Sequence, residues 1–252
     1  MSGVLEVKKL SKSFDGIVVA RDVDLTLHAG RVVGLIGPNG AGKTSLFNLI
    51  SGVVKPDAGT VLLNGATLDG QKFHKRVRAG LSRTWQHVRL FPSLSVIDNL
   101  IIAARDYPGE RLMSVLLTPG KVRTAARSAR EKARETLERM GLGNTAEKSV
   151  GDLPYGQQKL VGVARALMND ARCLLLDEPM AGVEGRTYEA MQRVVREVAL
   201  SGVAVCVVEH NVAFIRDLCD EAVFMFQGRI LGRGSVADLT ANPQLTELYF
   251  GH

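Results

Sequence analysis

One glycine-rich segment restricts the fold of this chain more than any other: residues 37–44 read Gly-Pro-Asn-Gly-Ala-Gly-Lys-Thr. The segment matches the pattern G-x-x-x-x-G-K-[ST] at every fixed position. A wholly apolar run, residues 32–36, precedes it, and residues 43–51 place Leu46, Leu49 and Ile50 on one side of a helix. This order of strand, loop and helix predicts an α/β fold in which the loop surrounds an anion.

The glycines of this loop let the backbone turn tightly enough to point successive N–H groups at phosphate oxygens, and the helix N-terminus adds partial positive charge. We expect Lys43 to contact the β- and γ-phosphates of a nucleotide, and the hydroxyl of Thr44 to bind Mg²⁺. The nucleotide-binding residues expected in and beside the loop are Gly37, Pro38, Asn39, Gly40, Ala41, Gly42, Lys43, Thr44 and Ser45.

A second apolar run, residues 173–176, is followed directly by two acids, Asp177 and Glu178. Acids at the C-terminal end of a strand lie at the crevice where open α/β sheets bind ligands. Taken alone, the pair could be a helix N-cap with a first-turn carboxylate. Beside a phosphate loop, we expect Asp177 to hold Mg²⁺ and Glu178 to polarise the water that attacks the γ-phosphate.

The other elements follow from hydrophobic periodicity and turn residues. A small antiparallel sheet is expected from strands at residues 4–7, 17–19 and 23–27, with a further short β-region at 61–63. Residues 96–141 are expected to be helical, with interruptions at Pro108 and at Pro119-Gly120. Strands at 173–176 and 203–208 alternate with helices at 186–200 and 212–219, before a hairpin at 222–226 and 229–231. Such alternation predicts a parallel sheet covered on both faces.

Composition excludes some classes of protein and leaves others open. With 252 residues, of which 46% are hydrophobic, the chain can bury a full core. No apolar run approaches the roughly 20 residues that cross a bilayer, and the N-terminus lacks a secretory signal, so we expect a cytosolic protein. We expect Cys173, Cys206 and Cys219 to be buried thiols. A net charge of +6 favours an anionic partner, which could be nucleotide, nucleic acid or an acidic membrane surface.

The basic residues are densest at residues 121–139, where Glu131, Glu135 and Glu138 are mixed among them. Apolar residues recur there at helical spacing, so we expect an amphipathic helix with a solvated face and not a nucleic-acid-binding arm.

Several further segments, taken in order, resemble the ATP-binding cassette (ABC) ATPases along nearly the whole chain. Gln86 resembles the glutamine of that family's Q-loop, which senses Mg²⁺ and contacts a membrane subunit. Residues 153–157, Leu-Pro-Tyr-Gly-Gln, resemble the signature motif Leu-Ser-Gly-Gly-Gln, and His210 resembles the switch histidine that binds the γ-phosphate. Phe14 stands where the family places an aromatic residue against adenine, with Val19 in the same expected nucleotide-binding set. Residues 181–184 occupy the position of the D-loop.

The resemblance implies catalytic roles for Lys43, Gln86, Glu178 and His210, and Mg²⁺ ligation by Thr44, Gln86 and Asp177. It also implies that Tyr155, Gly156 and Gln157 bind the nucleotide of a partner cassette. Two residues depart from the family pattern. Pro154 replaces the signature serine, so binding there must depend on backbone N–H groups at a helix N-terminus. Glu184 stands where the D-loop usually has aspartate.

The fold that the resemblance implies is α/β: a P-loop NTPase (RecA-like) core with an N-terminal antiparallel β subdomain and an inserted α-helical subdomain. The core is expected at about residues 1–87 and 160–252, and the helical subdomain with the signature motif at about 88–159. The cofactors implied are ATP and Mg²⁺.

The sequence Tyr-Gly-Gln-Gln at 155–158, residues 84–91 and the ending Leu-Tyr-Phe-Gly at 248–251 resemble the subfamily that powers import of branched-chain amino acids. The implied partners are a second ABC ATPase, two transmembrane permease subunits and, indirectly, an external substrate-binding protein. The implied location is peripheral, on the cytoplasmic face of the inner membrane, with no nucleic acid bound. Urea or amide import, export, a soluble ABC ATPase acting on nucleic acid or ribosomes, and a regulatory ATPase remain alternatives.

Residues 88–92, Val-Arg-Leu-Phe-Pro, admit two interpretations. Leu90 and Phe91 could be a buried connector. Alternatively, they help to line the groove that receives a cytoplasmic helix of the membrane subunit, as the resemblance implies.

Overall fold

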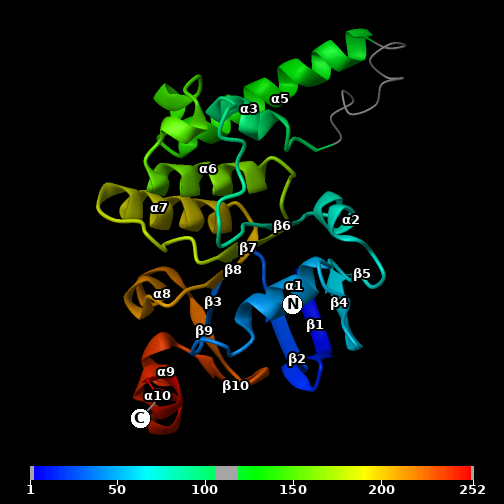
Figure 1. Ribbon diagram of the computed structural model, residues 1–252, viewed down its shortest axis with the longest axis vertical. Helices are drawn as coiled ribbons and strands as arrows, with labels where there is room; N and C mark the ends of the chain where they lie inside the picture. The colour runs from blue at the N-terminus through cyan, green and yellow to red at the C-terminus, as the bar shows by residue number, and fades with distance from the viewer. Residues whose placement is uncertain (1–2, 106–118, 251–252) are drawn as a thin grey trace. The chain divides into compact units, whose positions relative to one another are not determined.

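The computed structural model describes residues 3–105 and 119–250 and divides the chain into two compact units (Figure 1). The first unit comprises Met1–Gln86, Arg172–Ala181 and Val195–His252. The second comprises His87–Ala171 and Gly182–Val194. The expected boundary between residues 159 and 160 falls inside a continuous helix, and the second unit extends beyond it. The second unit includes the whole of that helix, residues 155–167, and this stretch of it ends at Ala171.

The first unit begins with a four-stranded antiparallel sheet in the order β2-β1-β4-β5. Its strands are β1 (Leu5–Phe14), β2 (Ile17–Leu27), β4 (Ala58–Leu63) and β5 (Ala66–Thr67). The antiparallel sheet was expected, but the separate strands predicted at 17–19 and 23–27 form one strand, β2. Residues 20–22 continue the strand through register shifts in its pairing with β1. Val23, Leu25 and Leu27 are directed at the core, whereas Ile17 is 70% exposed.

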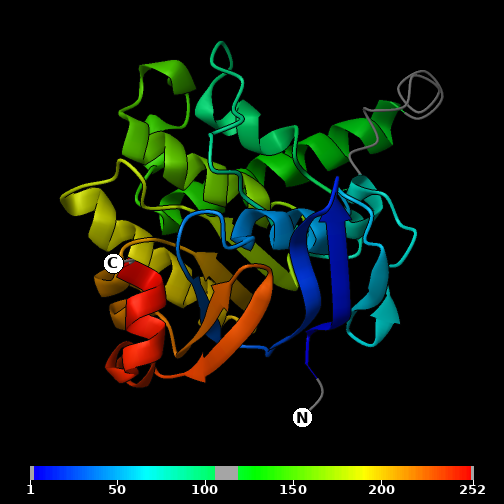
Figure 2. The same ribbon diagram turned by 60° about the horizontal axis from the view of Figure 1, so that its bottom comes forward.

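The second sheet of this unit has six strands in the order β10-β9-β3-β8-β7-β6 (Figure 2). Its strands are β3 (Val32–Ile36), β6 (Leu81–Arg83), β7 (Cys173–Asp177), β8 (Ala204–Val208), β9 (Glu221–Phe226) and β10 (Arg229–Gly234). All neighbours pair in parallel except β9 and β10, which form the expected antiparallel hairpin. Every residue of β3, β7 and β8 is buried, as the continuous apolar runs predict.

The core of the first unit joins both sheets to α1 (Lys43–Ser51), whose Leu46, Phe47, Leu49 and Ile50 are fully buried in one hydrophobic cluster. The other helices of this unit are α2 (Phe73–Arg78), α8 (Val212–Leu218), α9 (Val236–Ala241) and α10 (Pro243–Phe250). All three cysteines are free, and burial raises the pKa of the Cys173 and Cys206 thiols.

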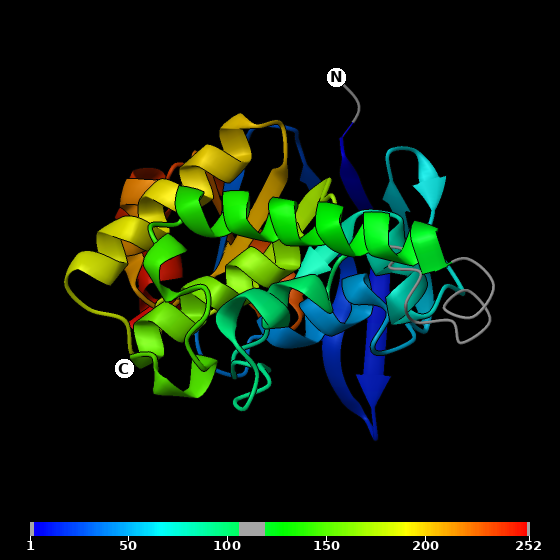
Figure 3. The same ribbon diagram turned by 90° about the horizontal axis from the view of Figure 1, so that it is seen from above.

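The second unit is helical. Its helices α3 (Val96–Ile101), α5 (Pro119–Arg139) and α6 (Tyr155–Leu167) lie side by side, as Figure 3 shows from above. Short 3-10 turns at Gly143–Thr145 and Val150–Asp152 lead to α6. The helix α7 (Arg186–Leu200) begins in this unit and ends in the first.

The expected amphipathic helix at residues 121–139 is confirmed as part of α5, since Ala129, Ala133 and Leu137 are buried while Arg127 and Glu131 form an exposed ion pair. Pro119-Gly120 was expected to interrupt a helix, and α5 begins at Pro119, because proline is tolerated in a first helical turn; residues 106–118 lie outside the described part of the chain. The interruption predicted at Pro108 lies outside the described residues. Within the described ranges, no helix is both long and apolar enough to span a bilayer.

Candidate functional site

The phosphate loop connects β3 to α1 with a backbone that two glycines make possible. Gly37 has a φ of 150° and Gly42 a φ of 102°. A Cβ atom on Gly37 would lie 2.0 Å from the carbonyl oxygen of Met225, and one on Gly42 would lie 2.4 Å from that of Val19. Any other residue would therefore be strained and would also collide with neighbouring backbone. The close approach also places the backbone of Val19 beside the loop.

The ammonium group of Lys43 is directed at the backbone of the phosphate loop. Lys43 is 6% exposed, and its Nζ donates hydrogen bonds to the carbonyl oxygens of Gly37 and Pro38 at 2.7 and 2.9 Å. Burial lowers the pKa of Lys43, while the nearby charges of Glu178 and Asp177 oppose that shift. Among the described residues no side chain caps α1, and its first turn contains no acid. The first N–H groups of α1 and the ammonium group of Lys43 thus suit a bound phosphate.

A hydroxyl and a carboxylate meet at the start of α1. Asp177 ends β7, and its Oδ1 accepts a hydrogen bond from Thr44 Oγ1 at 3.5 Å. Two hard oxygen donors of this kind suit Mg²⁺, which binds through one or two protein groups together with substrate phosphates and water. A larger cluster of three His, Cys, Asp or Glu side chains is absent from the part of the chain that the structure describes. The Thr44 hydroxyl and the Asp177 carboxylate by themselves fit a metal shared with a nucleotide.

Glu178 is the point where three segments converge. Its Oε2 accepts a hydrogen bond from Gln86 Nε2 at 2.7 Å, and its Oε1 lies 2.9 Å from His210 Nε2. Its backbone N–H donates to the carbonyl oxygen of Val208, and its φ is 48°, which is rare for a residue other than glycine. Strained backbone of this kind persists where surrounding structure holds it, and it is concentrated at functional sites. Gln86, predicted as a metal ligand, is here hydrogen-bonded to the predicted base.

Sequence reasoning missed three residues that hydrogen-bond to predicted residues of this site. Glu209 is buried, and its two carboxylate oxygens accept hydrogen bonds from the N–H groups of Met180 and His210. Burial raises its pKa, an effect that the charge of Glu178 increases and these hydrogen bonds oppose. Tyr249 Oη donates to the carbonyl oxygen of His210 at 3.1 Å. The third is Arg83, whose side chain pairs with Asp177. The sequence feature that could have indicated Glu209 is its position directly before the candidate histidine, His210.

The predicted signature residues belong to the second unit. Pro154 is the N-cap of α6, and Tyr155, Gly156 and Gln157 form its first turn, which no side chain among the described residues caps. A Cβ atom on Gly182 would lie 3.3 Å from the ring of Tyr155, so that ring covers the glycine. The structure thus places these residues at an uncapped helix N-terminus, in a different unit from Lys43 and Glu178.

The remaining predicted residues have less defined surroundings. Phe14 ends β1 and is 44% exposed, with Lys12 Nζ 5.0 Å from the centre of its ring. Its role against adenine stays a prediction. Glu184 is exposed.

Comparisons with known proteins show the family to which the chain is similar. A family model described as ABC transporter matches residues 20–181. The chain is 33% identical to the high-affinity branched-chain amino acid transport ATP-binding protein BraF of Pseudomonas aeruginosa, over 98% of each chain. It is 34% identical to the corresponding protein LivG of Escherichia coli K12, also over 98% of each chain. The lipopolysaccharide export system ATP-binding protein LptB of Acidithiobacillus ferridurans is 32% identical over 100% of this chain and 98% of its own.

Two solved structures are similar over almost their full lengths. One is a nucleotide-free ATP-binding cassette from an ABC transporter, with a TM-score of 0.86, 28% identity and 99% of each chain covered. The other is the ADP conformation of an ATP-binding cassette of an ABC transporter, with a TM-score of 0.84, 26% identity and 100% of each chain covered.

Proposed function

Because this chain belongs to the ABC transporter family, in which it is an ATP-binding transport ATPase, we propose that it energises the import of branched-chain or related amino acids. One observation above all supports the assignment of the ATPase site. Glu178 is held between Gln86 and His210, next to an Asp177 carboxylate that faces Thr44. The import assignment is supported by 33–34% identity to BraF and LivG over 98% of each chain.

In the proposed reaction the loop residues hold the nucleotide, and Lys43 exchanges its carbonyl partners for β- and γ-phosphate oxygens. Thr44 and Asp177 would hold Mg²⁺, which when bound neutralises charge on the phosphate oxygens. Glu178 orients and polarises the attacking water, since phosphoryl transfer depends on a positioned nucleophile more than on covalent catalysis. Gln86 and His210 fix the carboxylate of Glu178 in the resting site.

The proposal includes a dimer of cassettes in which Tyr155, Gly156 and Gln157 of one chain contact the nucleotide held by the other. Its support is the uncapped N-terminus of α6, which is suited to phosphate and needs no serine at position 154. The further proposed partners are two transmembrane permeases and, through them, an external substrate-binding protein. The chain would then lie on the cytoplasmic face of the membrane without entering it.

The test begins with ATP. Purified protein should bind and hydrolyse Mg-ATP, and Lys43→Ala should lose tight ATP binding in calorimetry because the loop loses its positively charged side chain. A Lys43→Ala variant with unchanged affinity would remove that residue from the role assigned here.

The transported substrate requires the complete complex. The chain should copurify with its permease subunits, and proteoliposomes containing that complex should accumulate labelled leucine, isoleucine or valine when ATP is supplied. The 32% identity to LptB favours export as the second candidate. Stimulation of the ATPase by lipopolysaccharide, with no amino-acid uptake, would select export. Uptake of labelled urea would select amide import.

A further inference from the structure

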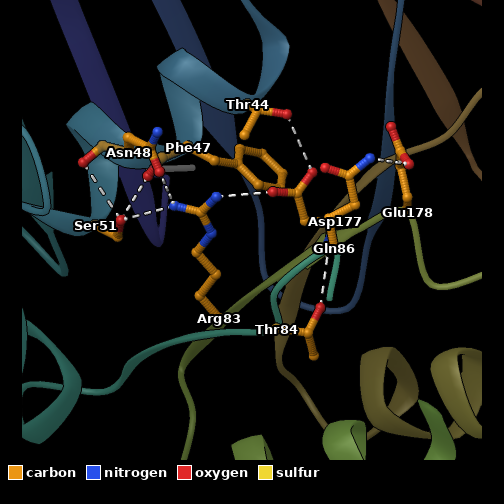
Figure 4. Close-up of polar contacts among 9 residues, drawn as sticks. All are labelled: Thr44, Phe47, Asn48, Ser51, Arg83, Thr84, Gln86, Asp177 and Glu178. Atoms are coloured by element: carbon orange, nitrogen blue, oxygen red, sulfur yellow. Dashed lines mark hydrogen bonds and ion pairs between the residues drawn. The ribbon is translucent and has the colours of Figure 1, made fainter. Parts of the chain in front are cut away.

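Arg83 is a buried arginine that joins the acid pair to the phosphate-loop helix. It ends β6, where it pairs in register with Leu175 of β7. Its Nη2 lies 2.7 Å from Oδ2 of Asp177, and the side chains of both residues are only 1% exposed. Figure 4 shows the guanidinium group between Asp177 and the residues of α1. A buried arginine is held by several partners at once, and these partners define its orientation.

The other nitrogen of the guanidinium group binds α1. Nη1 donates to Asn48 Oδ1 at 2.7 Å and to Ser51 Oγ at 3.2 Å. The guanidinium carbon also lies 5.6 Å from the ring centre of Phe47 and 4.5 Å from that of Trp85. These contacts fix the plane of the group, because a guanidinium presents its donors in a rigid fork and stacks on aromatic faces.

The consequence for Asp177 is that its two oxygens are used differently. Oδ2 is bound by Arg83, while Oδ1 faces Thr44 Oγ1 (Figure 4). A carboxylate held through one oxygen cannot rotate freely, so the other oxygen keeps its direction. Partners that orient a metal-binding side chain in this way commonly alter metal affinity when they are removed.

Arg83 also stands three residues before Gln86, on a segment that hydrogen-bonds to the acid pair. Thr84 Oγ1 accepts a hydrogen bond from the N–H of Asp177, and Gln86 Nε2 donates to Glu178. Residues 83–86 therefore contact Asp177 and Glu178 through two side-chain donors and one hydroxyl acceptor. The same short segment holds both acids.

We propose that Arg83 is a positioning residue that orients Asp177 for Mg²⁺, and so sets how much Mg²⁺ the protein needs to bind nucleotide tightly. This inference rests on the proposed function, because it takes Asp177 and Thr44 as the Mg²⁺ site. In this role the guanidinium group acts on the metal site through Asp177 and not as a ligand of the nucleotide or the metal.

The decisive variant is Arg83→Lys, which keeps the charge but loses the fork that spans Asp177 and α1. Binding of the non-hydrolysable analogue AMP-PNP to the full chain would be measured across a Mg²⁺ titration and in EDTA. The Mg²⁺ concentration at half of the affinity gain should rise about 10-fold or more. Affinity in EDTA should stay within about 2-fold of the parent. Hydrolysis by the variant should recover when Mg²⁺ is raised by a similar factor.

The matched control is Arg76→Lys. Arg76 is also buried and also binds α1, because its Nη1 donates to the carbonyl oxygens of Leu49 and Ile50. Its hydrogen bonds go to backbone carbonyls, so the variant should lower the melting temperature and leave the Mg²⁺ requirement unchanged. An Arg83→Lys variant with the parent Mg²⁺ requirement, or with equal losses in Mg²⁺ and in EDTA, would overturn the proposal.

Two further variants keep the test decisive. If Arg83→Lys does not fold, the double variant Asn48→Ala/Ser51→Ala removes the α1 partners and leaves the ion pair. It should raise the Mg²⁺ requirement to a smaller degree, and an unchanged requirement would contradict the role of Arg83.

The variant Asp177→Asn separates the proposed Mg²⁺ site from the proposed role of Arg83. If it leaves the Mg²⁺ requirement unchanged, the metal site itself is wrong; if it alone changes the requirement, only the role of Arg83 is wrong.

Discussion

Glu178, the proposed general base, has a backbone conformation that the surrounding fold must hold in place. A φ of 48° in a non-glycine residue costs on the order of 1–3 kcal/mol. Its backbone bond to Val208 and its side-chain contacts with Gln86 and His210 hold this conformation. The carboxylate is therefore kept at the end of β7 with both oxygens already oriented.

The variant Glu178→Gln tests this assignment, because it keeps the shape of the side chain and loses the base. Hydrolysis should fall by about 10²-fold or more while ATP affinity survives. Phosphate release and calorimetry measure the two quantities, and light scattering with Mg-ATP should show a trapped dimer. Glu221→Gln is the matched control, since Glu221 pairs with Arg233 on β10. Monomer alone in Mg-ATP would contradict both the base and the dimer.

Glu209 provides a prediction about pH. Burial raises its folded-state pKa above the ordinary value of 4.5, so the folded protein binds this proton more tightly than the unfolded chain. Its contribution to stability is complete below pH 4.5 and is lost as pH rises through the raised pKa. Glu209→Gln cannot titrate. The free energy of unfolding, measured by urea at several pH values, should therefore shift in favour of the variant as pH rises through that window. A difference that is constant with pH would contradict the buried, titrating carboxylate.

At the scale of elements, one side chain of α3 organises the turn that precedes the helix. Asn99 is fully buried; its Oδ1 accepts from the N–H of Phe91, and its Nδ2 donates to the carbonyl oxygens of Phe91 and Ser95. The segment 91–95 therefore depends on an amide with both donor and acceptor.

Asn99→Ala should lower the free energy of unfolding by about 1–3 kcal/mol, the usual cost of leaving buried polar groups unpaired. Urea denaturation of the isolated chain measures it. Thr124→Ala is the control, because that hydroxyl bonds to the carbonyl oxygen of Gly120 within α5 and the residue is exposed. An Asn99→Ala variant as stable as the control would show that the turn does not need the amide.

At the scale of the whole molecule, the two units carry different parts of the proposed transport cycle. The first unit holds the phosphate loop, the acid pair and His210, and the second holds the signature residues and Phe91. Phe91 is 48% exposed, and the guanidinium carbon of Arg165 lies 5.3 Å from its ring centre. The buried-connector interpretation is therefore wrong for this side chain. An exposed aromatic residue beside an arginine fits a protein interface better.

Phe91→Ala should weaken assembly with the permease subunits, since truncating an interface anchor commonly costs about 2 kcal/mol or more. The isolated subunit should keep its melting temperature and ATP affinity. Recovery of the variant in the membrane complex, compared with Val53→Ala as a partly exposed apolar control, measures the effect. Normal assembly and transport by the variant would eliminate the docking role.

The sequence by itself determined the elements whose signals are local. The phosphate loop, α1 from Lys43 to Ser51 and α7 from Arg186 to Leu200 all have the bounds that residue pattern predicts. Glycine conformations, a continuous apolar run and helical periodicity are properties of neighbouring residues, so they can be read before the chain is folded. The acid pair after β7 was predictable for the same reason.

Only the tertiary structure decided which distant residues share one site. Arg83 reads as an ordinary charged residue in the sequence, and its pairing with Asp177 depends on β6 and β7 lying next to each other in the sheet. The contacts of Glu178 with Gln86 and His210 join residues 92 and 32 positions apart. Burial and pairing arise from long-range packing, which places a polar side chain where its partner is and which no local pattern records.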